Sequence, residues 1–322
     1  MAARTPVRFM TWNLRFDSMP DNITVPQTIS SLPNPITEPA VFLNLTGEQP
    51  WSTRRIKVYE RIIGEGIQIL GCQEALVRQV DDLQELLGDG WDHVGVGRDD
   101  GVDAGEFSPI YWNKSLFTLI NNDTFWLSQT PFVAGSKFPG AGSVRIATAT
   151  HFKLNKSGKR FTYINTHLDD QSDAQRQLGA SLILWRAHSE ASNGSTVILT
   201  GDFNSQAAGD GSGAYQIITG QLAPIAINQT FKEAFPIAKR SLPNFEMLDL
   251  RTQLPRISVA GNWATFTGFV DPADSSQYIH IDFIFGGNNG GWGTTFHKVE
   301  NQLTDDGVLA SDHRPVIADL LL

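Results

Sequence analysis

The sequence predicts an α/β protein in which a single domain spans residues 1–322. Short apolar runs rich in β-branched residues, such as residues 195–200, alternate with longer segments whose apolar positions repeat with a helical period, such as residues 53–64. Several of the apolar runs end directly in a carboxylate, carboxamide or imidazole side chain. Since no repeat of solenoid length and no hinge-like linker divides the chain, one domain is expected.

The first elements of this domain are a strand and a helix. Residues 4–17 alternate apolar and polar positions and predict a strand that delivers Asn13 to a sheet edge. Ser52 can cap a helix over residues 53–64, whose apolar positions share one face. The opposite, polar face of this helix carries Arg54, Arg55 and Lys57, and we expect it either to be solvated or to reach anionic groups of a substrate.

The middle of the chain continues the alternation. A buried strand over residues 67–73 is followed by Glu74 and then by a helix over residues 75–87. Further strands are predicted over residues 91–97, and residues 108–112 and 116–126 are expected to pair with each other. A β-hairpin is predicted from residues 144–154 and 160–167, turned at residues 155–158.

The last third has a long helix, a central strand and weaker patterns. A helix over residues 172–188 precedes the central strand at residues 195–200. A short helix is expected near residues 213–218. Strands are expected over residues 258–269, 278–285 and 316–321.

Residues 18–50 form an insertion without a helical or strand period. The segment holds six prolines, which cannot join a sheet interior and which reduce the freedom of a loop. Four apolar residues in it are expected to pack back on the domain: Val41, Phe42, Leu43 and Leu45. We expect the insertion to form a wall over one side of a cleft, or else to be a surface loop with no bearing on substrate.

Composition excludes several classes of function. The net charge of −9 disfavours an extended nucleic-acid groove, because such grooves depend on clustered Lys and Arg. No apolar run approaches the about 20 residues of a membrane span, so no membrane partner is expected. The one cysteine, Cys72, excludes an internal disulfide and is expected to be buried and inert. A monomer is expected.

Asn-x-Ser/Thr sequons are more frequent than the composition predicts. Chance gives about two in a chain with this content of Asn, Ser and Thr. The excess favours a secreted protein whose leader is absent from this sequence, and the alternative is a cytoplasmic protein. The sequons start at Asn22, Asn44, Asn113, Asn122, Asn155, Asn193 and Asn228.

The central strand ends in the motif Thr200-Gly-Asp-Phe-Asn-Ser205. Alternation places Asp202 and Asn204 on one side and Phe203 on the other, in the core. A carboxylate beside a carboxamide suits the orientation of a water molecule and the stabilisation of a phosphoryl oxygen. An isolated Gly-Asp-x-Asn sequence is also a common turn, so the other strand ends decide between the two interpretations.

Polar residues at the other strand ends supply a constellation around this motif. Carboxylate and amide oxygens favour a hard cation, Mg²⁺ or Mn²⁺, whereas the chain has neither paired cysteines nor an HExxH motif for zinc. A histidine beside a carboxylate can form a hydrogen-bonded pair. Because the carboxyl ends of strands converge in α/β sheets, we expect these residues to meet. They are Asn13, Glu74, His167, Asp202, Asn204, Asp282, Asp312 and His313.

The motifs at these positions resemble the endonuclease/exonuclease/phosphatase superfamily, which contains apurinic endonucleases, DNase I, deadenylases and inositol polyphosphate phosphatases. They occur in the family's order and span nearly the whole chain. Two further segments, GRDDGVDAGEFSPIYW (97–112) and FWLSQTP (125–131), resemble a bacterial and fungal branch loosely related to the deadenylases. The family motifs are TWNLR (11–15), CQEAL (72–76), NTHLD (165–169), TGDFN (200–204), IDFIF (281–285) and SDHRP (311–315).

This resemblance implies a DNase I-like fold, a four-layer α/β sandwich of two mixed β-sheets flanked by helices. It places Asn13 and Glu74 at the metal, with Asp312 as a further ligand. It also implies that Asp202 orients or deprotonates the attacking water. It further implies that Asn204 and His167 bind the phosphoryl group. His313, held by Asp282, would complete the phosphate clamp or act as a proton partner.

The expected activity is Mg²⁺- or Mn²⁺-dependent hydrolysis of phosphoesters. The sequence favours diester cleavage on small substrates or short nucleic-acid ends, and a phosphomonoesterase for nucleotides or sugar phosphates is the alternative. A non-catalytic scaffold is disfavoured, because both the Asp-x-Asn pair and the metal carboxylate are present. Arg98 opens a Gly/Asp loop at a strand end and is expected to bind substrate, since its guanidinium can pair bidentately with phosphate.

Overall fold

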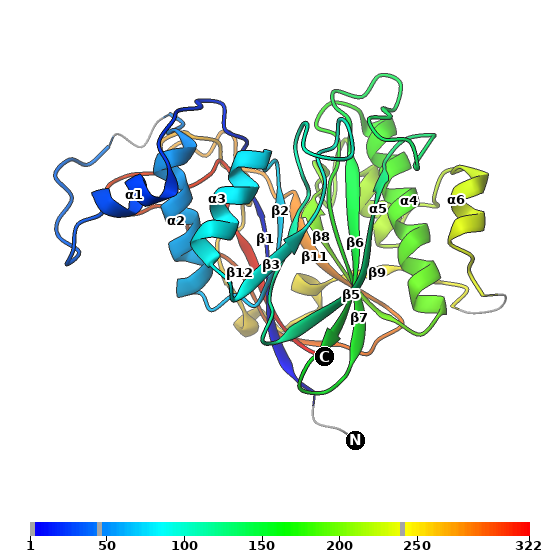
Figure 1. Ribbon diagram of the computed structural model, residues 1–322. Coiled ribbons are helices and arrows are strands. Elements are labelled where there is room, and N and C mark those ends of the chain that lie inside the picture. The colour runs from blue at the N-terminus through cyan, green and yellow to red at the C-terminus, as the bar shows by residue number, and fades with distance from the viewer. Residues whose placement is uncertain (1–3, 44–46, 239–241) are drawn as a thin grey trace.

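The computed structural model of the chain describes residues 4–43, 47–238 and 242–322. Two β-sheets of seven and six strands pack face to face, and helices cover their outer faces (Figure 1). Helices α2 (Trp51–Gly64) and α3 (Val77–Leu87) cover the seven-stranded sheet, and α4 (Asp173–Ser192) covers the six-stranded sheet. This is the predicted four-layer sandwich. None of the described helices is both long enough and apolar enough to cross a membrane.

The seven-stranded sheet has a parallel pair at its centre. Strands β1 and β2 run in the same direction, with Asn13 opposite Gln73, so both end at the same edge. Strand β13 flanks β1 on the other side and is antiparallel to it. The order of the sheet is β10 (Val259–Gly261), β12 (Gly293–Val299), β13 (Val316–Leu321), β1 (Pro6–Asn13), β2 (Ile69–Gln73), β4 (Ile110–Asn113) and β3 (Trp91–Val94).

The six-stranded sheet repeats this arrangement. Strands β7 and β8 are parallel, with His167 opposite Asp202, and β11 runs antiparallel to β8 with Asp282 opposite Asp202. The order of the sheet is β5 (Phe117–Trp126), β6 (Ile146–Leu154), β7 (Arg160–His167), β8 (Thr196–Asp202), β11 (Asp282–Gly287) and β9 (Met247–Asp249). The remaining short elements are α1 (Val25–Ser31), α5 (Gly213–Ile218), α6 (Gln229–Ala234), η1 (Leu250–Gln253) and η2 (Arg256–Ser258).

Most predicted elements are confirmed, but two predictions of strands are wrong. Strands β4 and β5 do not pair with each other, because β4 inserts between β2 and β3 while β5 pairs with β6 in the other sheet. Alternation identifies a strand but not its partner. Residues 258–269 contain only the three-residue β10, since Gly261 has a φ of 78° and the extended run ends there.

The polar face of α2 is not solvated. The side chains of Arg54 and Arg55 are both fully buried. Arg54 donates hydrogen bonds to the carbonyl oxygens of Leu14 (2.6 Å) and Ala310 (2.9 Å), and it also donates to Arg15 (3.1 Å). The guanidinium therefore joins the segment that follows β1 to the segment that precedes Asp312, and neither arginine is available to a substrate.

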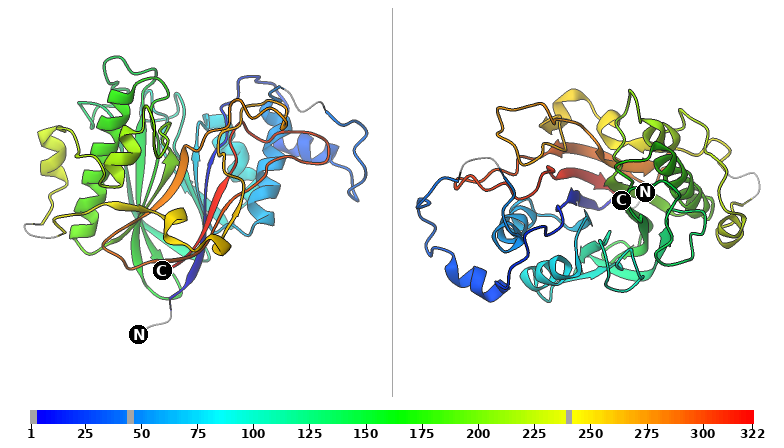
Figure 2. Two further views of the ribbon diagram at one scale, coloured as in Figure 1. Left: turned by 180° about the vertical axis from the view of Figure 1, so that it is seen from behind. Right: turned by 90° about the horizontal axis from the view of Figure 1, so that it is seen from above.

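The insertion contains a helix that the sequence pattern did not reveal. Helix α1 begins after Thr24, whose side chain accepts a hydrogen bond from the backbone of Gln27 in a capping box. Arg55 donates to the carbonyl oxygen of Thr24 at 2.5 Å and thereby attaches the insertion to α2. The views from the front, from behind and from above all show that the insertion projects from the outer side of α2, far from α4 (Figures 1 and 2).

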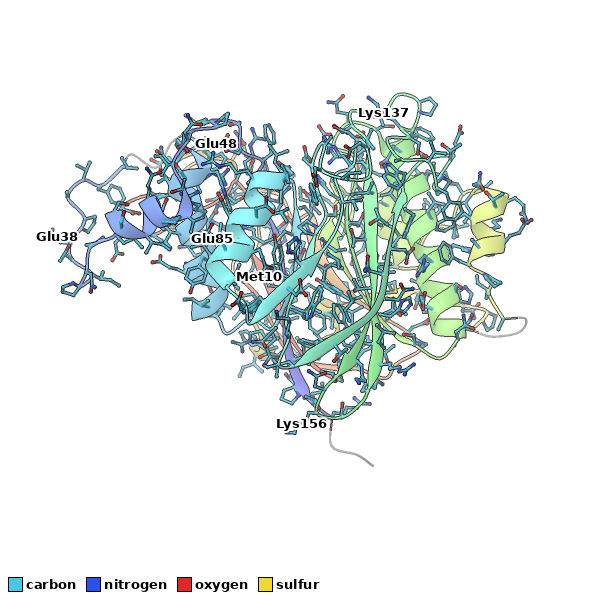
Figure 3. All side chains as sticks on the ribbon, viewed as in Figure 1. Met10, Glu38, Glu48, Glu85, Lys137 and Lys156 are labelled. Carbon is cyan, nitrogen blue, oxygen red and sulfur yellow. The ribbon has the colours of Figure 1, made fainter. Side chains whose placement is uncertain are left out.

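The apolar residues of the insertion pack less than expected. Val41 and Phe42 keep 66% and 57% of their surface exposed, so the prediction that they pack on the domain is wrong. The backbone NH of Leu43 donates to Asp306, while the sequon at Asn44 and the side chain of Leu45 lie outside the described residues. Glu38 marks the outer end of the insertion in Figure 3, whereas Met10 lies inside the sandwich and is fully buried.

A buried polar network joins the two sheets behind the strand ends. Asn165 of β7 donates to the carbonyl oxygen of Cys72 at 2.7 Å, and its Oδ1 accepts from Gln73 at 2.7 Å. Gly71 makes this approach possible, because a Cβ atom there would lie 2.5 Å from Asn165 Oδ1 and 2.7 Å from the hydroxyl of Tyr163. As predicted, the Cys72 thiol is fully buried, and burial raises its pKa far above the usual range.

We predict that Gly71→Ala destabilises the protein by about 1–3 kcal/mol, because the added methyl overpacks the network between the sheets. Gly64→Ala is the matched control: a Cβ at Gly64 meets no atom within 4 Å, and alanine favours the helical backbone of α2. Urea unfolding monitored by circular dichroism measures both. Equal stability of the two variants would show that the sheets tolerate a wider separation at this point.

Candidate active site

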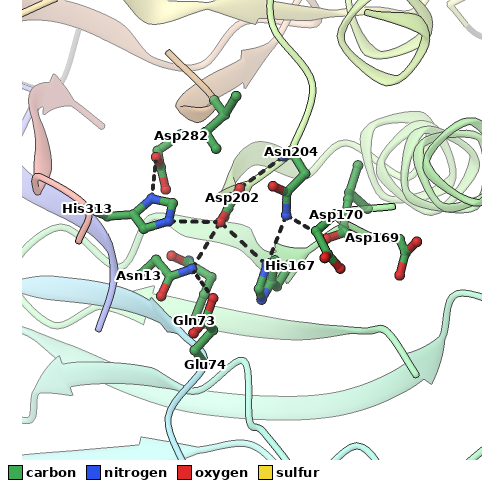
Figure 4. A network of polar contacts seen from close by, with 12 residues as sticks. Asn13, Gln73, Glu74, His167, Asp169, Asp170, Asp202, Asn204, Asp282 and His313 are labelled. Carbon is green, nitrogen blue, oxygen red and sulfur yellow. Dashed lines mark hydrogen bonds and ion pairs between the residues drawn. The ribbon is translucent and has the colours of Figure 1, made fainter. Parts of the chain in front are cut away.

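The carboxyl ends of the two parallel strand pairs face each other across the sandwich. Asn13 and Glu74 stand at the ends of β1 and β2, and His167 and Asp202 stand at the ends of β7 and β8 (Figure 4). A pocket of about 360 Å³ opens here. Of the eight predicted strand-end residues, six line it, while Asn13 and Asp282 lie directly behind and hydrogen-bond to lining residues.

Asp202 is the centre of this group. Its side chain is 1% exposed, and its Oδ2 lies 3.0 Å from Asn13 Nδ2, 3.4 Å from His167 Nε2 and 3.6 Å from His313 Nε2. Its other oxygen accepts the backbone NH of Asn204 at 2.9 Å. Burial, together with the nearby Asp282 carboxylate, raises the pKa of Asp202 to about 7.

His313 and Asp282 form the predicted histidine–carboxylate pair. Their Nδ1 and Oδ2 atoms are 2.9 Å apart, and both side chains are buried. Burial disfavours the imidazolium, but the carboxylates of Asp282 and Asp202 outweigh this effect and raise the pKa of His313 to about 10. His313 is therefore a cation in this site, with its Nε2 directed at Asp202.

Three residues that line the pocket have left-handed backbones, and Arg15, with a φ of 56°, is one of them. Asn204 has a φ of 45° and Glu74 a φ of 63°, conformations that non-glycine residues adopt at some energetic cost. The extended strand consequently ends at Asp202, and Asn204 reaches the site through a turn rather than by the predicted alternation. Its Nδ2 donates to the carbonyl oxygen of Leu168 at 3.0 Å, and Phe203 is buried in the core as predicted.

The environment of His167 selects one tautomer of its ring. Arg145 Nη1 lies 2.9 Å from Nδ1 of His167, and a guanidinium can only donate, so Nδ1 must accept. Burial and the positive charge of Arg145 lower the pKa of His167 well below its ordinary value. The ring is thus neutral and carries its proton on Nε2, which faces Asp202. Nothing near position 145 in the sequence identifies His167 as its partner, so this role of Arg145 follows only from the structure.

Arg98, the predicted substrate ligand, does not line this pocket. Its Nη1 donates to Glu106 at 2.5 Å, and its carbonyl oxygen accepts from the indole of Trp126. Glu106 stands between Arg98 and the pocket and is itself a lining residue. Burial and the neighbouring Glu74 carboxylate raise the pKa of Glu106 to about 7. The pocket's lining arginines are Arg15 and Arg145.

The donor set at the pocket fits a hard divalent cation. Ligand atoms of Glu74, Asp202 and His313 lie within 4.8 Å of one another. Among these atoms, the carboxylate oxygens of Glu74 and Asp202 are the donors that a hard cation prefers. Buried carboxylates also repel each other, and burial together with Glu74 raises the pKa of Asp312. A cation among these oxygens would relieve this repulsion.

Asn13 directs its amide NH2, and not its oxygen, at the carboxylates of the proposed metal site. Its Nδ2 donates to Glu74 Oε1 at 2.9 Å and to Asp202, while its Oδ1 accepts the backbone NH of Arg15. The amide therefore orients the two carboxylates. Asp312 lines the pocket, and its Oδ1 accepts from the hydroxyl of Ser311 at 3.3 Å.

The insertion at residues 18–50 does not form the expected wall. None of its described residues lines the pocket, whose near side is formed by Arg15 and Phe16. The guanidinium of Arg15 lies 3.3 Å from Glu48, near the end of the insertion, and over the ring of Phe16 at 4.2 Å. The bulk of the insertion instead lies on the outer side of α2 (Figure 1).

Comparisons with known proteins agree with this fold. An endonuclease/exonuclease/phosphatase family protein from Bacteroides vulgatus is 29% identical in a match that covers 99% of this chain and 100% of the other, with a TM-score of 0.75. A family member from Bacteroides thetaiotaomicron is 24% identical over 99% and 98% of the two chains (TM-score 0.70), and a mannosyl-6-phosphatase from the same organism is 22% identical over 98% and 100% (TM-score 0.69). These two show the fold alone.

A search of curated protein sequences found no match. The model of the endonuclease/exonuclease/phosphatase family matches residues 10–313, a range that contains five of the six motifs in full, the first three residues of the sixth (311–315) and every strand-end residue of the site. The chain belongs to the endonuclease/exonuclease/phosphatase family.

Proposed function

We propose that this protein is a divalent-metal-dependent phosphoester hydrolase. One observation carries the proposal: the Asp202 carboxylate is buried among an amide, a neutral imidazole and an imidazolium, and it borders an open pocket. A carboxylate held in this way can bind a water molecule and accept its proton as the water attacks phosphorus. Asn204 fixes the orientation of Asp202 through its backbone NH.

Glu74 and Asp312 are the residues that would hold Mg²⁺ or Mn²⁺, and Asn13 would join them after a half-turn of its amide. When bound, such an ion neutralises charge on the phosphoryl oxygens. The carboxylate oxygens and the amide of this set are the ligands that these ions favour.

The neighbouring donors have separate roles at the phosphoryl group. His167 presents Nε2–H beside Asp202, and Asn204 presents its amide within 3.1 Å of His167 Nε2, so both can donate to a phosphoryl oxygen. The imidazolium of His313, held by Asp282, stabilises negative charge next to Asp202 and carries a proton that the departing alkoxide can take.

We propose diesters with small or short groups as the first substrate class, because the net charge of −9 and the limited pocket disfavour a long polynucleotide. One observation supports phosphomonoesters as the second class. Arg15, Arg145 and the protonated His313 all line the pocket, and three cations suit the dianion of a terminal phosphate. A non-catalytic scaffold would not need this donor set.

Hydrolysis of bis-p-nitrophenyl phosphate and p-nitrophenyl phosphate tests the proposal and separates the two classes. We expect turnover with Mg²⁺ or Mn²⁺ and its loss after exhaustive chelation, with recovery when the ion is restored. Undiminished activity in the chelator would contradict the metal assignment, and inertness toward every phosphoester would contradict the function.

Glu74→Gln should lower kcat/KM by about 10²-fold or more at limiting Mg²⁺, because the variant removes a negative charge at the proposed metal position. Part of the loss should be recovered as the Mg²⁺ concentration rises. Glu85→Gln, which removes an exposed carboxylate from α3, is the matched control. Identical Mg²⁺ titrations of Glu74→Gln and wild type would show that Glu74 does not bind the ion.

Arg145→Gln should lower kcat by about 10- to 100-fold, since the neutral side chain no longer forces the proton of His167 onto Nε2. It should also raise the pKa of His167, because a cation that lowers it is removed. NMR of the imidazole nitrogens measures the tautomer and the pKa directly. The control is Arg160→Gln at the exposed start of β7. If His167 keeps the same tautomer and pKa in Arg145→Gln, Arg145 does not position it.

A further inference from the structure

One side of the pocket presents oxygen atoms that lack partners. Glu106, Ser143 and Asp170 line the pocket beside His167 and are referred to here as the hydroxyl-binding wall. Arg98 occupies one carboxylate oxygen of Glu106, and Arg145 occupies one of Asp170 at 2.9 Å. Glu106 Oε1, Asp170 Oδ2 and the Ser143 hydroxyl make no hydrogen bond with any described residue.

The wall is held in place by the backbone. The buried carboxylate of Asp169 accepts the NH of Ser143 at 3.0 Å and that of Gly142 at 3.1 Å. The carbonyl oxygen of Glu106 accepts the NH of Arg98 at 3.1 Å, and the NH of Phe107 donates to Ala75 at 2.7 Å. Because these bonds fix the backbone of Ser143 and Glu106 before a ligand arrives, the ordering cost of binding is reduced.

The charge of the wall selects among ligands. The half-exposed Asp170 carboxylate only accepts hydrogen bonds and repels a second phosphate placed beside the one under attack, and Glu106 adds to this repulsion when it is ionised. The guanidinium of Arg98 pairs with Glu106, and that of Arg145, which itself lines the pocket, pairs with Asp170, so the wall's own carboxylates largely neutralise these two cations. A neutral group with several hydroxyls fits this surface, whereas the next phosphate of a polynucleotide does not.

The pocket also has apolar lining residues. Phe266, Ile279 and Ile281 line it, and Ile281 is 3% exposed. A sugar ring has hydroxyls at its edge and C–H groups on its faces. Such a ring can donate to the wall on one side and contact these apolar side chains on the other.

We propose that the wall of Glu106, Ser143 and Asp170 binds hydroxyl groups of the alcohol part of the substrate, so that the enzyme acts on phosphate esters of sugars or similar polyols. This inference rests on the proposed phosphoester hydrolysis and assigns its substrate class. It favours polyol esters over nucleic-acid ends.

Matched substrate pairs test the inference. A hexose 6-phosphate is compared with n-hexyl phosphate, and diglyceryl phosphate with dipropyl phosphate, so that each pair has the same type of ester with and without hydroxyls. We expect kcat/KM to be at least tenfold higher for the hydroxylated member of whichever pair is hydrolysed. A single-stranded oligonucleotide should be a poorer substrate than the hydroxylated ester.

Variants of the wall residues test whether the wall causes the preference for hydroxylated esters. Glu106→Gln and Ser143→Ala should each lower the ratio of kcat/KM between the hydroxylated and plain esters by several-fold to tenfold. Asp103→Asn removes a carboxylate from the same loop as Glu106, but it is exposed and does not line the pocket, so the ratio should stay at the wild-type value. Ser143→Ala keeps the test valid if Glu106→Gln does not fold, which thermal unfolding reveals.

Different results would contradict the polyol inference and the proposed phosphoester hydrolysis. Equal kcat/KM for hydroxylated and plain esters, or faster cleavage of the oligonucleotide, overturns the polyol inference and leaves phosphoester hydrolysis standing. Ratios unchanged in Glu106→Gln and Ser143→Ala overturn the assignment of the wall. If the folded wild-type protein hydrolyses none of the four esters and neither p-nitrophenyl compound, the polyol inference and the proposed phosphoester hydrolysis are both overturned.

Discussion

The site depends on one constraint. The parallel strand pairs β1/β2 and β7/β8 lie in sheets that pack face to face, and both pairs end at the same edge of the sandwich. Each pair delivers polar side chains at its carboxyl end, and the packing of the sheets brings the two sets together around Asp202. The close approach needs a residue without a side chain at Gly71 and a satisfied polar network around Asn165. The packing between the two sheets thus sets the distances between the strand-end side chains of the site.

Concentrating carboxylates at this edge is energetically costly, and the fold offsets the cost locally. His313 is held as a cation between Asp282 and Asp202, and Asn13 donates to both Glu74 and Asp202. The remaining repulsion is the kind that a bound divalent ion relieves. Farther from the pocket, the buried guanidinium of Arg54 ties together the backbones that carry these groups, which explains why it is unavailable to a substrate.

We propose that the charges that line this pocket disfavour a nucleic-acid substrate. Arg15, Arg145 and His313 line the pocket together with the acceptors Glu106 and Asp170, beside which we propose that the leaving group lies. The insertion at residues 18–50 has no share in this selection, since it is attached to α2 through Arg55 and extends outward. We therefore propose that specificity rests on the loops before β4 and β6 and after β7.

The sequence by itself determined the elements and the strand-end residues. Local periodicity and the motif at residues 200–204 depend on neighbours along the chain, so β1, the hairpin of β6 and β7, and the positions of Asp202 and His313 followed from it. Only the tertiary structure decided that β4 and β5 belong to different sheets, that Arg54 is buried, and that Arg145 and not Arg98 reaches the pocket. These outcomes depend on contacts between residues far apart in the chain, and a side chain's charge and size do not specify which distant group will satisfy it.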